Sequence, residues 1–193
     1  MTYETKNFDH LIGLEGFSDE SLKNHFTLYN GYVLNANKLA DILADMLKSD
    51  KTALPEFAEL KRRFGWEFNG ARLHEYYFGN LTKNGEFLDK NSGLFKKIEN
   101  DFGSYDQWQK DFKAAATMRG IGWVILYYDK ENDKLFNAWI NEHDLGHLSG
   151  ATPLLVLDVF EHAYLTDYGI KRIDYIEMFF KTVNWKEAEK RLG

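Results

Sequence analysis

Residues 152–168 read TPLLVLDVFEHAYLTDY and hold the most informative pattern of this 193-residue chain. The continuous apolar run LLVLDV, residues 154–159, is typical of a strand buried on both faces. Asp158 lies inside that run, and burying a carboxylate is costly unless it is paired or bound to a metal ion. The alternative for Asp158 is an N-cap of the following helix. His162 follows four residues later, so a strand-to-helix junction can turn both side chains toward one point.

Upstream of this segment, the first half of the chain has the apolar periodicity of two helices. The first helix is predicted from Leu22, His25, Tyr29, Tyr32, Ala36, Leu39, Leu43 and Met46, and the second from Phe64, Phe68, Ala71, His74, Phe78 and Leu81. Ser18 is a suitable N-cap for the first helix, and Pro55 suits the first turn of the second. Gly65 and Gly70 interrupt the second pattern, so we expect a break near them.

The apolar faces of both predicted helices carry a histidine, His25 in the first and His74 in the second. If these helices pack face to face, the two imidazoles come close together. A lone histidine on an apolar face is more often a hydrogen-bonded core residue, and that alternative remains for each of them. Together with Asp158 and His162 they make a set of three imidazoles and one carboxylate, which suits iron, manganese or zinc better than magnesium or calcium.

The second half of the chain mixes helical and strand patterns. Two β-branched and aromatic runs, 123–128 (WVILYY) and 135–140 (LFNAWI), flank the turn-rich DKENDK at 129–134 and predict a β-hairpin. The run 154–159 adds a third strand. Helices are predicted over residues 105–118, 174–182 and 185–192. The fold class is therefore α+β, with a helical N-terminal half followed by a mixed half that contains a small sheet.

The composition excludes several classes of function. The chain has no cysteine, which removes disulfides, thiolate nucleophiles, iron–sulfur clusters and thiolate zinc sites. A net charge of −6 without a basic stripe predicts no nucleic-acid partner, because phosphate contacts dominate such binding. No signal segment is visible, and no run of about 18 apolar residues predicts a membrane-spanning helix. We therefore expect a cytoplasmic protein without a membrane partner.

Four segments, in order along the chain, resemble the iron/manganese superoxide dismutase family. They are residues 102–116 (FGSYDQWQKDFKAAA), 120–126 (GIGWVIL), 152–168 and 172–185 (RIDYIEMFFKTVNW). The third matches the family's D-x-W-E-H signature, with Phe160 in place of the tryptophan. The resemblance runs from about Leu22 to the C-terminus. It implies an N-terminal antiparallel helical hairpin domain over residues 1–86 and a C-terminal α/β domain over 87–193. That second domain would contain a three-stranded antiparallel sheet, with the metal site between the domains.

The resemblance also assigns roles to single residues. The implied metal ligands are His25, His74, Asp158 and His162. Tyr32 matches the gateway tyrosine, Trp123 an aromatic wall of the pocket and Arg172 the rim arginine. His143 falls where manganese-type members place a glutamine that hydrogen-bonds the bound solvent, whereas Gly70 falls where iron-type members place theirs. The resemblance thus implies that a histidine takes the solvent-orienting role in this chain; the alternative for His143 is a polar loop residue.

Two departures from the family pattern concern the first helix. Six residues separate His25 from Tyr32, where the family has seven, so we expect a change in helix winding. Tyr29 replaces the family's second histidine, which meets a tyrosine of the partner subunit, here Tyr164. Glu161 beside His162 is retained and implies a homodimer in which Glu161 bonds the other subunit's metal-bound histidine, with a tetramer as an extension.

The implied activity is the conversion of superoxide to dioxygen and hydrogen peroxide by one iron or manganese ion per subunit. Val156 is bulkier than the glycine found there in many manganese-type members and favours iron, although the ligand set accepts both metals. Two alternatives remain. One is a non-catalytic superoxide-dismutase-like protein that serves as a binding or structural dimer. The other is a different mononuclear iron enzyme, such as an oxygenase with two histidines and one carboxylate.

Overall fold

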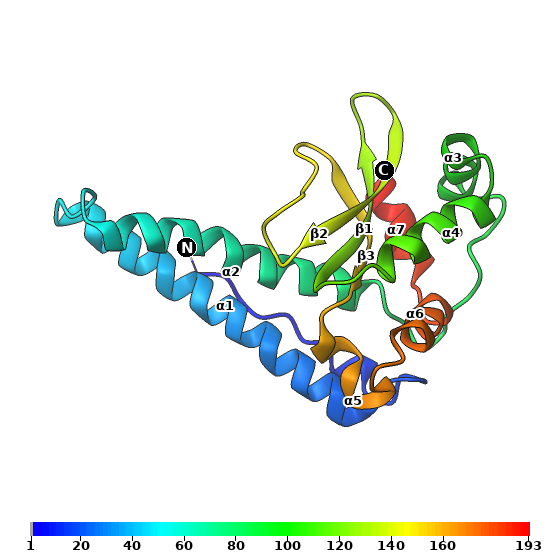
Figure 1. The fold of residues 1–193 in the computed structure, drawn as a ribbon, viewed down its shortest axis with the longest axis horizontal. Helices are drawn as coiled ribbons and strands as arrows, with labels where there is room; N and C mark the ends of the chain where they lie inside the picture. The colour runs from blue at the N-terminus through cyan, green and yellow to red at the C-terminus, as the bar shows by residue number, and fades with distance from the viewer. Residues whose placement is uncertain (1) are drawn as a thin grey trace.

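The computed structural model describes residues 2–193 and has two parts (Figure 1). Two long antiparallel helices, α1 (Asp19–Lys48) and α2 (Pro55–Gly79), form an arm that extends away from a three-stranded sheet with its own helices. The sheet consists of β1 (Gly122–Asp129), β2 (Lys134–Asn141) and β3 (Thr152–Asp158). The remaining elements are η1 (Asp9–Leu11), α3 (Gly93–Phe102), α4 (Tyr105–Ala116), η2 (Glu161–Ala163), α5 (Leu165–Tyr168), α6 (Arg172–Lys181) and α7 (Trp185–Leu192). The α+β class and the three-stranded antiparallel sheet are confirmed.

Helix α1 starts at the predicted cap, where the Ser18 side chain accepts a hydrogen bond from the backbone N–H of Ser21. It is α-helical from Asp19 to Lys48, so the expected change in winding is wrong. Its regular geometry explains why none is needed. His25 and Tyr32 are seven residues apart, which is close to two turns of about 3.6 residues each. Both side chains therefore leave the helix on the same face.

Helix α2 runs without interruption through both glycines, so the expected break is wrong as well. A Cβ at Gly65 would meet nothing within 4 Å, whereas a Cβ at Gly70 would lie 2.6 Å from the Tyr32 ring. Gly70 therefore lets the aromatic ring from α1 lie directly against the α2 backbone. The glycine serves the packing of the two helices rather than ending one of them.

Strand β1 lies in the centre of the sheet, between β2 and β3, and pairs antiparallel with both. In this register Trp123 on β1 is opposite Asp158 on β3, which brings the two side-chain positions together at one end of the sheet. The pairing shifts between Leu126 and Tyr127, whose partners are Leu155 and Pro153, so the bulge is in β3 at Leu154. The hairpin between β1 and β2 falls where DKENDK predicts it.

Helix α3 was not predicted from the sequence. Its N-cap Ser92 accepts a hydrogen bond from the backbone N–H of Phe95, and it buries Leu94, Phe95 and Ile98. These apolar residues lie at positions consistent with one helix face, but the helix has only 10 residues and follows a polar loop. Ends of the predicted helices differ from the observed ends by a few residues, as expected from frayed termini.

The outer edge of β3 is covered by two polar side chains. The Asn80 carbonyl oxygen accepts a hydrogen bond from the backbone N–H of Val156, and Arg191 on α7 donates to the backbone oxygen of Leu154 at 2.9 Å. Arg191 also donates to the Asn80 carbonyl oxygen at 3.1 Å. Helix α7 is thereby attached to the sheet edge.

One continuous apolar core includes residues of α1, α2, the sheet and the C-terminal helices. The predicted boundary between residues 86 and 87 falls in the connection from α2 to α3. The division into two domains stays a prediction. Within residues 2–193, no helix combines the length and apolar character that crossing a bilayer requires.

Candidate metal centre

Four side chains from four elements converge between α1, α2 and the end of β3. They are His25, His74, Asp158 and His162, and their donor atoms all lie within 4.8 Å of one another. Asp158 Oδ2 is 3.2 Å from His25 Nε2 and 3.3 Å from His162 Nε2. His74 Nε2 lies 3.8 Å from the same oxygen. Donor atoms that bind one ion at about 2.1 Å are themselves roughly 3 to 4 Å apart, so this spacing fits a common metal ion.

The hydrogen bonds of His74 show which of its ring nitrogens is free. Its Nδ1 faces the backbone oxygen of Gly70, one turn earlier on α2, and a carbonyl oxygen only accepts, so Nδ1 carries the proton. Nε2 of the neutral ring is then a bare lone pair, and within residues 2–193 it is buried without a hydrogen-bond partner. Buried polar atoms are rarely left unpaired. A metal ion is the partner that fits, because ligating histidines donate their other N–H to a backbone carbonyl in this way.

The electrostatics keep the cluster in the protonation state that metal binding needs. Burial lowers the pKa of His25 and lowers that of His74 well below its usual value. Burial alone would raise the pKa of Asp158, but the charge of His162 and hydrogen bonds from His162 and His25 outweigh it and hold that pKa far below its usual range. The neutral imidazoles of His25 and His74 therefore face an ionised carboxylate.

Asp158 combines the two roles that the sequence suggests, a cap of the following turn and a member of the metal-binding cluster. Oδ1 accepts a hydrogen bond from the backbone N–H of Phe160 at 2.8 Å, as in a capped turn, while Oδ2 faces the histidines. The turn bond orients the carboxylate, and short 3₁₀-helix η2 then brings His162 back to it. The strand-to-helix junction positions both side chains as the sequence indicates.

A chain of hydrogen bonds lies beside the cluster and joins Trp123, His143 and Tyr32. The Trp123 indole N–H donates to His143 Nδ1 at 3.0 Å, so Nδ1 is an acceptor. Burial lowers the pKa of His143 to about 4, and its one ring proton is therefore on Nε2 at neutral pH. Nε2 lies 2.8 Å from the Tyr32 hydroxyl and donates to its oxygen. Both nitrogens of His143 are thus engaged, and the Tyr32 proton is left to point elsewhere.

The sequence matches known proteins that have this kind of metal centre in their names. Residues 90–191 match the model of the iron/manganese superoxide dismutases, C-terminal domain. The iron superoxide dismutase of Aquifex pyrophilus is 40% identical over 190 residues, which cover 95% of this chain and 88% of that protein. The chain belongs to the iron/manganese superoxide dismutase family. A second iron superoxide dismutase, from Aquifex aeolicus, is 38% identical over 95% of this chain and 88% of its own length. A manganese superoxide dismutase of Haloferax volcanii is 36% identical over 87% of this chain and 82% of its own length.

The family's signature tryptophan is Phe160 in this chain, and its ring stacks between two imidazoles. Its centroid lies 4.8 Å from that of His143 and 5.2 Å from that of His162, with interplanar angles of 24° and 22°. Phe160 therefore keeps an aromatic wall between the cluster and the loop that carries His143. It brings no N–H group into the pocket.

Sequence reasoning missed three aromatic residues that lie around the four converging side chains and His143. The Tyr175 hydroxyl donates to the backbone oxygen of Asp158 at 2.7 Å, and Tyr77 packs against His25 with centroids 5.3 Å apart. Trp66 packs on both Tyr32 and His143, at 5.5 and 4.5 Å. Tyr77 lies three positions after His74 on α2 and Trp66 eight positions before it, which places both near the helix face that carries His74. Helical periodicity could therefore have indicated both residues.

Arg172 and Glu161 lie apart from the four converging side chains. Arg172 Nη1 donates to the backbone oxygens of Met118 and Gly120, both at 3.0 Å, just before β1. Its Nε and Nη2 are buried without a partner among the described residues. Glu161 is exposed, next to His162, whose side chain is 25% exposed while those of His25, His74 and Asp158 are 3% exposed or less.

Proposed function

We propose that the protein converts two superoxide ions and two protons to dioxygen and hydrogen peroxide. The residues that would hold the required ion are His25, His74, Asp158 and His162. The observation that carries the proposal is the convergence of three imidazole nitrogens on one carboxylate oxygen, with His74 Nε2 buried and unpartnered. When bound, iron or manganese supplies one-electron redox chemistry at this point.

Tyr32 is the residue that would deliver a proton into the pocket. Because His143 Nε2 donates to its oxygen, the Tyr32 hydroxyl can donate in turn to a small oxygen ligand. Burial raises the pKa of Tyr32, so the hydroxyl keeps its proton at neutral pH. In this proposal His143 acts through Tyr32 rather than on the bound solvent directly, since an imidazole with one N–H has no second donor. Trp123 holds the His143 tautomer.

Superoxide is an anion and the protein carries a net charge of −6, so a local positive charge must attract it. We propose Arg172 as that charge. Its Nε and Nη2, buried without a partner in residues 2–193, support this role, because a guanidinium with free donors is suited to an anion. Arg172 also lies over the rings of Tyr164 and Trp139, at 5.8 and 5.6 Å, which hold its side chain in place.

We propose a homodimer in which Glu161 of each subunit hydrogen-bonds His162 of the other. The one-quarter exposure of His162 supports it, because a carboxylate from outside can reach the ring and orient it. Leu165, three positions after His162, is an exposed apolar side chain that such a contact could cover. Tyr29 does not join this contact, since its hydroxyl faces Glu75 and the backbone of Lys6. A tetramer and a cytoplasmic location stay predictions.

We propose iron as the working metal, with manganese accepted. The test is reconstitution of metal-free protein with each ion, followed by activity per bound metal. Equal activity with both ions would contradict an iron preference. Relatives with either metal in their names are similar to this chain over more than four fifths of its length, which supports acceptance of both.

The decisive experiment measures superoxide consumption and metal content of the wild type beside His162→Ala. We expect activity that follows bound iron or manganese and disappears with the substitution. His10→Ala, an exposed histidine in the N-terminal segment, is the control and should change neither quantity. A wild-type protein that binds metal but consumes no superoxide would favour the oxygenase alternative, and one that folds without metal would favour a structural dimer.

A further inference from the structure

The loop that carries His143 connects β2 to β3 and has little regular structure. Its first turn is held by a pair of backbone hydrogen bonds between Asn141 and Leu145, at 2.8 and 3.3 Å. Glu142, directly before His143, has a φ of 51°, in the left-handed region that non-glycine residues rarely adopt. Such a conformation persists only where the surroundings hold it. The position of His143 therefore depends on contacts that side chains make to the loop.

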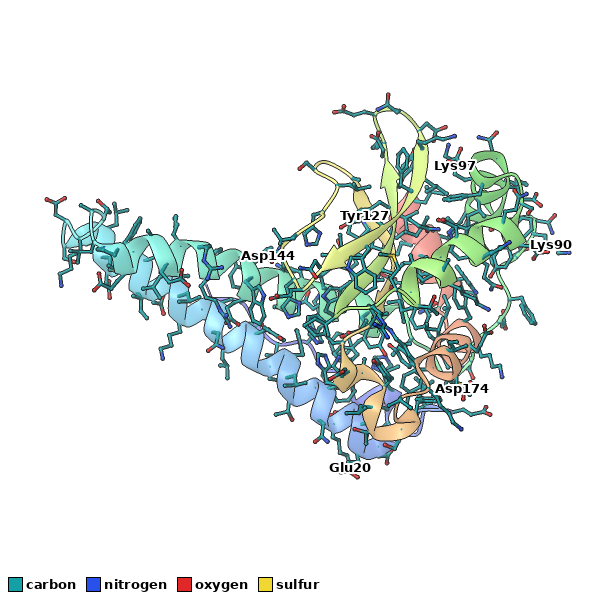
Figure 2. All side chains as sticks on the ribbon, viewed as in Figure 1. Glu20, Lys90, Lys97, Tyr127, Asp144 and Asp174 are labelled. Carbon is teal, nitrogen blue, oxygen red and sulfur yellow. The ribbon has the colours of Figure 1, made fainter. Side chains whose placement is uncertain are left out.

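His147 provides such a contact inside the loop. Its Nε2 lies 2.9 Å from the backbone oxygen of His143, and a carbonyl accepts, so Nε2 carries the proton. In this tautomer Nδ1 is an acceptor, and the Tyr127 hydroxyl donates to it at 2.7 Å. The imidazole thus joins the main chain of His143 to a buried tyrosine of the central strand. Figure 2 labels Tyr127 on β1 and Asp144 in the loop, next to His143.

A bulge in β3 lies opposite the position of Tyr127 on β1. The pairing of β1 with β3 shifts between Leu126 and Tyr127. The partners are Leu155 and Pro153, so Leu154 on β3 is the extra residue, and bulges occur often next to functional sites. Tyr127, which pairs with Pro153 beside this bulge, is the residue whose hydroxyl reaches the loop.

We propose that His147 is a positioning residue, which fixes the main chain of His143 against Tyr127 and thereby aims the His143 ring at the Tyr32 hydroxyl. This inference rests on the proposed function, in which His143 holds Tyr32. His143 Nε2 must remain 2.8 Å from Tyr32 while Nδ1 stays 3.0 Å from Trp123. Both bonds require one ring orientation, and a shift of the His143 backbone breaks at least one of them.

The test compares two substitutions of His147 in the metal-loaded protein. His147→Leu removes the donor and the acceptor, whereas His147→Gln keeps one of each in its amide. We expect His147→Leu to lower superoxide turnover per bound metal about tenfold, the lower end of the cost of removing such an orienting partner, and His147→Gln to restore it to within about twofold of wild type. Ser149→Ala, an exposed residue of the same loop, is the control and should leave turnover unchanged.

A second readout is the visible absorption spectrum of the loaded protein. It should shift in His147→Leu and keep its wild-type form in His147→Gln, with equal metal content in both. Full turnover and an unchanged spectrum in His147→Leu would overturn the proposal, as would equal losses in both variants. If His147→Leu does not fold, Tyr127→Phe carries the test, because it deletes one hydroxyl and should reproduce the loss. A wild type without turnover would refute the proposed function, while the spectra would still test the positioning role.

Discussion

The four converging side chains and His143 border the same pocket, but the fold holds them by different means. His25, His74 and Asp158 project from α1, α2 and β3, where backbone hydrogen bonds set their positions. His143 projects from an irregular loop and is held by side chains, namely Trp123, Tyr32 and His147. The ion-binding atoms thus rest on a rigid frame, whereas the group that orients Tyr32 rests on a network of single hydrogen bonds.

This difference implies that metal binding and superoxide turnover can be lost separately. Changes in the frame should remove the metal, whereas changes around the loop should leave the metal bound and reduce turnover. Sites on helices and strands are held more precisely than sites on loops, so the loop needs the additional hydrogen bonds. Substitutions on each side test this separation.

The largest effect is expected from Asp158→Asn, which keeps the shape of the side chain and removes its charge. Three neutral imidazoles and an amide bind a cation far less well than a set with a carboxylate. We expect bound metal and superoxide turnover to fall to background, as measured by elemental analysis and an activity assay. Asp41→Asn, on the exposed side of α1, is the control and should retain both. Retention of metal by Asp158→Asn would contradict the proposed site.

A smaller effect, on turnover alone, is expected from Gly70→Ala. The new methyl group would lie 2.6 Å from the Tyr32 ring, so the ring must move and its hydroxyl must leave His143 Nε2. We expect turnover per bound metal to fall about tenfold with metal content unchanged. The matched control is Gly65→Ala on the same helix, where the methyl group meets open space and should raise the free energy of unfolding by about 0.5 to 1 kcal/mol. Equal behaviour of the two variants would contradict the packing role of Gly70.

The pH dependence of stability should report the buried neutral histidines in the metal-free protein. Burial lowers the pKa of His143 from 6.5 to about 4, so below pH 6.5 the unfolded chain binds a proton that the folded chain does not. Stability should therefore fall as the pH decreases from about 6.5 to about 4, by up to about 3 kcal/mol from His143 alone. The pKa values of His25 and His74 are also lowered by burial, so these residues add to the loss of stability at low pH.

Denaturant unfolding across this pH range, in wild type and in His143→Gln, separates the contribution of His143. Glutamine retains a donor and an acceptor but does not titrate, so its stability should decline less steeply toward acid. Identical slopes in the two proteins would show that His143 is not held neutral by burial.

The smallest effect is expected from Trp66→Phe. The Trp66 indole N–H donates to the Glu142 carboxylate at 3.1 Å, at an exposed position, while its ring packs on Tyr32 and His143. Phenylalanine retains most of the packing and loses the bond, so we expect a loss of about 0.5 to 1 kcal/mol in the free energy of unfolding. Turnover should change little. A loss of turnover as large as that expected for His147→Leu would move the positioning role from His147 to Trp66.

The frame and the loop also differ in how well the sequence predicts them. The apolar stripe with His25, the stripe with His74 and the apolar run that ends near Asp158 are periodic, and the structure brings these residues together as predicted. The role of His147 leaves no such pattern, because its partner Tyr127 is 20 residues away on another element. A contact between a loop and a strand depends on the tertiary arrangement, which periodicity does not encode.

The errors in helix α1 and helix α2 have a common origin. Spacing and glycine content describe a single helix, but the observed geometry also depends on the neighbouring helix. A seven-residue spacing suits a regular helix, and Gly70 is required by the ring of Tyr32 from α1. Helix α3 was missed because it is short and takes much of its stability from burying Leu94, Phe95 and Ile98.

The attachment of Arg191 to the edge of β3 has a consequence for synthesis. Leu154 and Arg191 are separated by 37 positions, so during translation the strand that ends at Asp158 leaves the ribosome well before the residue that covers it. Until then the outer edge of β3 lacks the bond from Arg191 to Leu154 and has only Asn80 to cover it, and an incompletely covered edge favours association with other nascent chains. We therefore expect residues 185–192 to protect newly made chains from aggregation as well as to stabilise the finished fold.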